Sequence, residues 1–236
     1  MPNIPSLEDL MKAGVHFGHQ KSKWHPKMRP FIFCEKNNIH VINLEETQKQ
    51  LEKAFGFIKE TVARGGTVLF VGTKNQVQDI VKDAALSCNM PFVVYRWMGG
   101  ALTNAQTVLG LVKKFRKMKE DKALGNYQKY TKKEQLELSR EIDRLNTIVG
   151  GMERLDKLPD VLFIVDIKKE KTAMAEALRK KTPVVAICDT NVNPELVDYP
   201  IPGNDDAVSS VKLLVGLVAE AVNEAREESK AGQLST

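Results

Sequence analysis

Four aspartates stand where an α/β protein could hold a divalent cation. Asp166 ends the apolar run 161–165, Asp189 ends the run 184–188, and Asp205 and Asp206 lie in the loop that follows. Ligands of open parallel sheets bind beyond the carboxyl ends of the strands. One interpretation is therefore an enzyme that transfers a phosphoryl group with Mg²⁺. The alternative is that these acids cap helices and brace loops, and it is favoured because no nucleophile pattern accompanies them.

The triplet Gly72-Thr73-Lys74 follows a predicted strand and precedes a predicted helix, as a phosphate loop does. The full G-x-x-x-x-G-K-[ST] spacing is absent, however, and no G-x-G-x-x-G follows any predicted strand. We therefore expect no cofactor, no small-molecule substrate and no catalysis. Lys74 remains a candidate for contact with a backbone phosphate.

Three histidines near the amino terminus, His16, His19 and His25, raise the question of a metal site, with Cys34 and His40 nearby. A His-x-x-His spacing is a weak zinc signal compared with paired Cys-x-x-Cys motifs. Stacking or hydrogen bonding of the imidazoles is the preferred interpretation, and we predict no bound metal.

The segment 15–30 is a loop without hydrophobic periodicity and without any acidic residue. Its basic side chains alternate with Phe17 and Trp24. Lysine and arginine neutralise phosphates, and an aromatic face can stack on an unpaired base, so this pattern is typical of RNA binding. The alternative is a solvated loop in which Trp24 packs into the core.

Charge is distributed unevenly along the 236 residues, whose formal net charge is +5. Residues 113–157 contain 13 basic and 8 acidic side chains, and residues 1–36 contain 6 and 3. From residue 160 onward there are 9 basic and 13 acidic side chains. Two basic regions and an acidic final third indicate a polyanionic partner on one side of the molecule and a different partner on the other.

These residues must be positioned by alternating strands and helices. Apolar runs at 67–71, 92–95, 161–166 and 184–188 predict buried strands, and the helices between them favour a parallel sheet. Residues 31–33 and 39–42 predict a β-hairpin. The prolines in 194–203 exclude regular structure there, a helix is expected from about 207 to 228, and 229–236 is expected to fray.

Two stretches within 105–158 repeat apolar residues every three and four positions, with charged residues between them. They predict an antiparallel coiled-coil hairpin inserted into the α/β domain, which would comprise residues 1–104 and 159–236. The basic side chains at 113–119 could form an ordinary solvated helix face, but their share of the net charge favours RNA contact.

The chain is long enough to bury a core, and it contains no apolar run near the length of about 20 residues needed to cross a bilayer. The amino terminus lacks the apolar region of a signal peptide, so we expect a cytoplasmic protein without membrane contact. Three scattered cysteines, an odd number, indicate reduced thiols.

Several segments resemble the signature segments of the second protein of the bacterial small ribosomal subunit, the S-two family. They are AGVHFGHQKSKWHPKMRPFIF, NNIHVINLEET, LFVGTKNQ, YRWMGGALTN, PDVLFIVD and CDTNVNPELVDYPIPGNDDAVSS. The resemblance spans about residues 6–225 and is least distinctive in the helical hairpin. Met98 departs from the family pattern, in which leucine is frequent at this position, without weakening the resemblance.

The resemblance implies a five-stranded parallel α/β domain with a protruding coiled coil, and a non-enzymatic role in translation. It further implies binding to small-subunit rRNA, proximity to mRNA, and help in seating the large mRNA-binding protein S-one. From charge and position, we assign protein contacts to the acidic side that includes Asp205 and Asp206. The residues expected to face RNA are Lys21, Lys23, Trp24, Lys27, Arg29, Lys74, Arg96, Trp97, Thr103, Asn104, Lys113, Lys114, Arg116 and Lys117.

Overall fold

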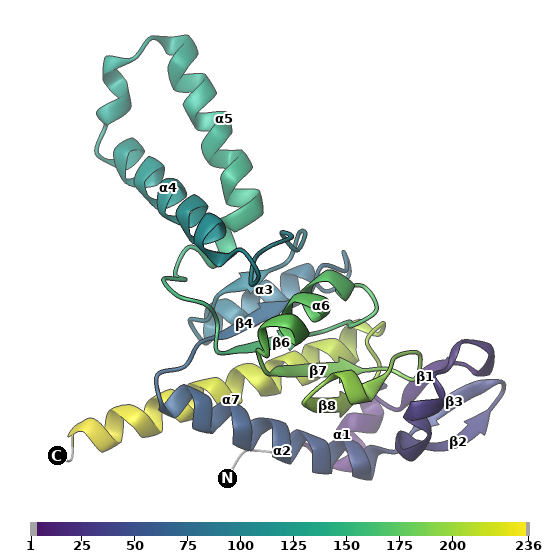
Figure 1. Ribbon diagram of the computed structural model, residues 1–236. Coiled ribbons are helices and arrows are strands. Elements are labelled where there is room, and N and C mark those ends of the chain that lie inside the picture. Colours follow the sequence, from purple (N-terminus) through teal and green to yellow (C-terminus); the bar gives the residue numbers. More distant parts are fainter. Residues whose placement is uncertain (1–3, 235–236) are drawn as a thin grey trace.

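A computed structural model describes residues 4–234 of the chain, with side chains described up to residue 229. Figure 1 shows a central sheet, a small second sheet and a projecting pair of helices. The strands are β1 (Phe17–Gln20), β2 (Ile32–Lys36), β3 (Ile39–Ile42), β4 (Val68–Val71), β5 (Phe92–Val93), β6 (Val161–Ile164), β7 (Val184–Cys188) and β8 (Tyr199–Pro202). The α-helices are α1 (Leu7–Lys12), α2 (Leu44–Ala63), α3 (Gln78–Ser87), α4 (Ala105–Ala123), α5 (Lys132–Val149), α6 (Lys171–Lys180) and α7 (Val208–Leu234). Short 3₁₀ turns are η1 (Lys21–Lys23), η2 (Pro26–Phe31), η3 (Asn126–Lys129), η4 (Gly150–Met152) and η5 (Pro194–Leu196).

The central sheet has five parallel strands in the order β5-β4-β6-β7-β8. Successive residues of a strand point to opposite faces. Phe70 and Phe163 therefore join the core beneath α2, α3 and α7, whereas Leu69 and Leu162 join the core beneath α6 and the base of the helical pair. Covering of both faces explains the uninterrupted apolar runs. The predicted five-stranded parallel α/β fold is confirmed.

The fifth strand corrects the sequence-based prediction of irregular structure around the prolines. Tyr199–Pro202 pairs with β7 in the register Val185↔Tyr199 to Cys188↔Pro202. Proline is tolerated in a strand at the edge of a sheet, because one side of the strand needs no ladder donor. The carboxyl terminus also differs from expectation: α7 continues to Leu234, through most of the segment expected to fray, and the last two residues lie outside the described range.

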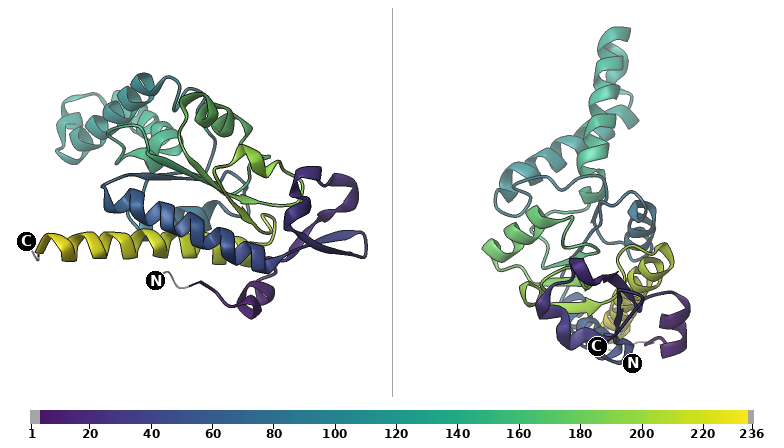
Figure 2. Two further views of the ribbon diagram at one scale, coloured as in Figure 1. Left: turned by 60° about the horizontal axis from the view of Figure 1, so that its bottom comes forward. Right: turned by 90° about the vertical axis from the view of Figure 1, so that its right-hand side faces the viewer.

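The second sheet is antiparallel, in the order β1-β3-β2. The predicted β2–β3 hairpin is present, and Asn37 and Asn38 turn the chain with positive φ values of 53° and 60°. Strand β1 was expected to be part of a loop. Its pairing with β3, at Phe17↔Val41 and Gln20↔Ile39, produces no alternation of buried and exposed residues that a pattern search would find. Figure 2 shows this sheet at one end of the molecule, beside the start of α2.

Helices α4 and α5 form the projecting hairpin of Figure 1. Their facing residues, among them Val112, Phe115 and Leu145, are buried and continuous with the core on the α6 side of the sheet. The tip turns at Gly125, which has a φ of 72°, and α5 starts with a capping box between Thr131 and Glu134. The helical pair is thus present, while its supercoiling and its independence as a domain stay predictions.

Candidate nucleic-acid interface and the ion cluster at the sheet edge

Lys74, a predicted phosphate ligand, lies among carboxylates at the carboxyl edge of the sheet. Its Nζ is 2.7 Å from Asp166 Oδ2, 2.8 Å from Asp205 Oδ1 and 2.9 Å from Asp206 Oδ1. These residues follow different strands, whose carboxyl ends meet at one edge because the strands are parallel. The Lys74 side chain is only 19% exposed. The ammonium group of Lys74 is therefore occupied by protein carboxylates, and its contact with RNA stays a prediction.

Electrostatics in this ion cluster (Lys74, Asp166, Asp189, Asp205, Asp206 and His19) follow from its excess of acids. Burial favours the neutral carboxyl, and the charges of Asp166 and Asp189 add to this effect, so the pKa of Asp205 rises to about 7. Burial alone would lower the pKa of Lys74, but the surrounding carboxylates outweigh it and raise the pKa. The cluster thus holds a fixed cation beside a carboxyl group that titrates near neutrality.

His19 ties the amino-terminal segment to this cluster. Its Nδ1 lies 3.0 Å from Asp189 Oδ1, and its Nε2 lies 3.4 Å from Asp206 Oδ2 and 2.9 Å from Asn191 Nδ2. The hydrogen bond to Asp189 raises the pKa of His19 above its usual value, against the effect of burial. The His19 backbone N–H also donates to Thr190 Oγ1 at 2.8 Å. Strand β1 is therefore fastened to the loop after β7 by an ionisable link.

The other two histidines of the zinc alternative point elsewhere. The His16 ring packs on Phe17, with 4.0 Å between ring centroids, and His25 Nδ1 accepts the Lys27 backbone N–H at 3.3 Å. Among the residues that the structure describes, no group of three or more His, Cys, Asp or Glu side chains is arranged to hold a metal ion. The imidazoles instead pack and form hydrogen bonds.

The loop after β5 is organised by Glu176 of α6, a residue that the sequence did not single out. The Glu176 carboxylate accepts hydrogen bonds from Trp97 Nε1–H at 3.0 Å, from the backbone N–H of Gly100 at 2.7 Å and of Leu102 at 3.0 Å, and from Thr103 through both its N–H and its hydroxyl. Burial is outweighed by these donors, so the pKa of Glu176 is lowered.

Two predicted RNA-facing residues are consequently engaged within the protein. Trp97 is 7% exposed, so little of its ring is open to a base, and Thr103 is half-buried against Glu176. Arg96 and Asn104, in the same loop, are exposed. A buried carboxylate that gathers donors from a distant loop leaves no local sequence signal, because its partners are more than 70 positions away.

The amino-terminal surface, defined here by Lys21, Lys23, Lys27 and Arg29, is exposed. Lys21 pairs with Glu35 at 2.9 Å and Lys27 pairs with Glu195. Lys23 and Arg29 form no ion pair with a carboxylate of the described residues. The Trp24 ring is half-buried beside His40, with 5.1 Å between ring centroids. Its exposure therefore lies between the two positions that the sequence allows, one facing RNA and one in the core.

The hairpin surface, defined by Lys113, Lys114 and Lys117 of α4, is also exposed. Lys114 lies 3.5 Å from Glu141 of α5, whereas Lys113 and Lys117 have no carboxylate partner in the described part of the chain. Arg116, expected to face RNA, is instead a brace: it pairs with Asp156 at 2.6 Å and donates to the carbonyls of residues 153 and 155. The predicted cationic residues of α4 thus divide into a structural arginine and surface lysines.

Asp205 and Asp206, assigned together to protein contacts, differ in exposure. Asp205 is 1% exposed, so it lies beneath the surface, and its assignment to protein contacts stays a prediction. The Asp206 side chain is 58% exposed, although it contacts Lys74 and His19 of the cluster, and Lys74 helps to lower its pKa against the effect of burial.

Among the helices of the described residues, none combines the length and hydropathy needed to span a membrane.

The fold and these surfaces define an α/β protein that presents cations on an amino-terminal segment and a helical projection. Residues 10–225 match the family described as ribosomal protein S2. The chain is 46% identical over 231 residues to small ribosomal subunit protein uS2 of Dehalococcoides mccartyi, covering 98% of this chain and 94% of the relative. It is 47% identical over 236 residues to uS2 of Corynebacterium glutamicum strain R, covering 98% and 88%.

The chain belongs to the ribosomal protein S2 family. It is a structural constituent of the small ribosomal subunit and a part of the cytoplasmic ribosome. The resemblance seen in the signature segments is confirmed over nearly the whole chain, and the alternative of a Mg²⁺-dependent enzyme is wrong.

Proposed function

We propose that the chain binds small-subunit rRNA through the amino-terminal surface and the hairpin surface. The main observation in support is that four cationic side chains are exposed and lack carboxylate partners among the described residues: Lys23, Arg29, Lys113 and Lys117. By contrast, Lys74 and Arg116 are neutralised within the fold. Unpaired cations gain most from a phosphate backbone, because they have no ion pair to give up. Arg96 and Asn104, exposed at the base of the hairpin, extend the proposed contact.

The test is the salt dependence of binding between the full chain and a transcript of the small-subunit rRNA. We expect the slope of log affinity against log salt to fall by about one for each of Lys113→Ala and Lys117→Ala. Lys212→Ala is a matched control, since Lys212 is exposed on α7, beyond the opposite face of the sheet. An affinity for the transcript that does not respond to salt would refute the proposal.

We further propose that the chain helps to seat the large mRNA-binding protein S-one, which would place it near the mRNA. Family membership is the basis of this proposal, and Asp206 is the acidic residue available for such a contact. Small subunits reconstituted with Asp206→Asn should retain this chain and bind less S-one. Asp198→Asn, at another exposed acid, is the control. Equal S-one occupancy in both variants would remove Asp206 from the contact.

A further inference from the structure

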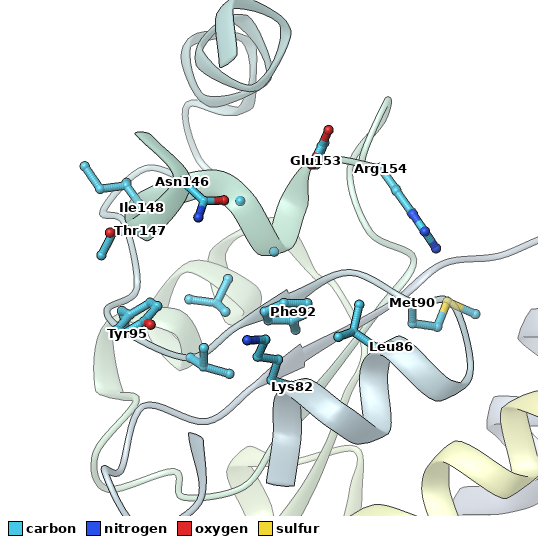
Figure 3. A pocket seen from close by; sticks show the side chains of 14 residues that line it. Lys82, Leu86, Met90, Phe92, Tyr95, Asn146, Thr147, Ile148, Glu153 and Arg154 are labelled. Atoms are coloured by element: carbon cyan, nitrogen blue, oxygen red, sulfur yellow. The ribbon is translucent and has the colours of Figure 1, made fainter. Parts of the chain in front are cut away.

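A cavity of about 280 Å³ lies where the edge strand β5 meets the base of the helical hairpin. Figure 3 shows Phe92 near the middle of the lining, Tyr95 and Arg154 at opposite ends, Asn146 above and Lys82 below. None of these residues belongs to the amino-terminal or hairpin surface. The cavity is therefore separate from both of these surfaces.

Close packing of glycine against the sheet edge builds this cavity. A Cβ atom on Gly151 would lie 2.2 Å from the Phe92 carbonyl oxygen, so only glycine lets the end of the hairpin approach β5 this closely. The carbonyls of Pro91 and Val93 accept hydrogen bonds from the backbone N–H groups of Phe70 in β4 and of Gly72 just after it. Backbone groups alternate in direction along a strand, so the Phe92 carbonyl points away from β4, toward Gly151. The cavity thus places the Phe92 ring beside the point where the end of the hairpin covers the edge of the sheet.

Its polar groups match a nucleotide. Lys82 and Arg154 are exposed and form no ion pair with a carboxylate of the described residues, whereas Glu153, the acid of the lining, is neutralised by Lys119 at 2.7 Å. The Asn146 carboxamide makes no side-chain hydrogen bond to any residue in the described part of the chain. A free carboxamide can pair with a base edge, an aromatic ring can stack on a base, and cations bind phosphate.

A second hollow, of about 500 Å³, adjoins the first and shares Tyr95, Thr147 and Ile148 with it. Arg96 lies in its lining. Tyr95 is 60% exposed between the two hollows, so its ring is available to a ligand that runs along both. The arrangement suits a strand of RNA that follows the base of the hairpin and turns one base inward.

We propose that this cavity binds one unpaired nucleotide of the rRNA, with its base between Tyr95 and Asn146 and its phosphates beside Lys82 and Arg154. The proposal rests on the rRNA binding proposed above and adds a position at which RNA is read by base rather than by charge. The net positive lining and the stacking face favour a nucleotide over an acidic side chain from a neighbouring protein, which would leave the aromatic face unused.

The test uses the full chain and the small-subunit rRNA transcript, with dimethyl sulfate reactivity measured base by base. Wild-type protein should protect at least one unpaired base, and Asn146→Ala should restore its reactivity and weaken binding about tenfold. Tyr95→Ala should act similarly, because base–aromatic stacking is lost, while Tyr95→Phe should retain protection and affinity. Lys212→Ala should change neither readout. Circular dichroism checks the folding of each variant, and the Tyr95 pair decides the matter if Asn146→Ala fails to fold.

Two negative results are distinguishable. If wild-type protein binds the transcript with the expected salt dependence, but Asn146→Ala and Tyr95→Ala keep its affinity and its protected bases, the cavity is not a nucleotide site and the proposed function stands. If wild-type protein does not bind the transcript, both the cavity assignment and the proposed rRNA binding are overturned.

Discussion

Replacing Lys74 by alanine separates a structural role for this residue from contact with RNA. The substitution leaves Asp166 and Asp205, whose side chains are 9% and 2% exposed, without their shared cation. Removal of one partner from a buried ion pair typically costs about 3–5 kcal/mol, because the remaining charge is buried without compensation. We therefore expect Lys74→Ala to lower the free energy of unfolding by about 3 kcal/mol or more.

The assay is urea denaturation followed by circular dichroism at pH 7.5 and fixed ionic strength. For a chain of this size, about 3 kcal/mol corresponds to a fall in Tm of roughly 6–12 °C. Lys27→Ala is the control, since Lys27 and its partner Glu195 are 47% and 62% exposed and such surface pairs contribute about 0–1 kcal/mol. Adding Asp166→Asn to Lys74→Ala should recover part of the lost stability, because it removes one uncompensated acid.

A different outcome would refute this reasoning. If Lys74→Ala changed the free energy of unfolding by less than about 1 kcal/mol, the cost of an uncompensated buried charge would be absent. If it also weakened rRNA binding as Lys113→Ala does, Lys74 would face phosphate, as the sequence alone predicted.

Three further perturbations test other parts of the structure. The pKa of Asp205 rises from 3.8 to about 7 on folding, so its contribution to stability is full below pH 4 and is lost as pH rises toward 7. Urea denaturation should therefore show that the difference in the free energy of unfolding between wild type and Asp205→Asn falls by about 2 kcal/mol between pH 5 and 7. A difference independent of pH would contradict the raised pKa. Glu176→Ala leaves buried donors unpaired and should lower the free energy of unfolding by about 3 kcal/mol. In a Trp24→Phe background, the fluorescence of Trp97 should also shift to the red, and an unchanged spectrum would argue against the role of Glu176. Gly151→Ala should cost about 1–3 kcal/mol in thermal unfolding, because its Cβ atom would collide with the backbone of β5; an unchanged Tm would show that the hairpin base shifts freely.

The amino-acid sequence by itself determined the family, the parallel sheet and the helical hairpin. Uninterrupted apolar runs such as Val161–Ile164 and Val184–Cys188 can be buried only between two layers, and the seams of α4 and α5 are set by helical period. The basic surfaces could likewise be located, because charge accumulates locally along the chain.

Only the tertiary structure decided which of the chemically suggestive residues are free to act. Lys74, Trp97 and Arg116 carry RNA-binding chemistry in isolation, yet carboxylates from distant segments occupy all three. No local pattern indicates such partners, because the contacts form between residues 40 to 132 positions apart once the strands align. Strand β8 could not be predicted from the sequence for a related reason. Its prolines exclude a central strand but not an edge strand, and only the assembled sheet shows which strand lies at the edge.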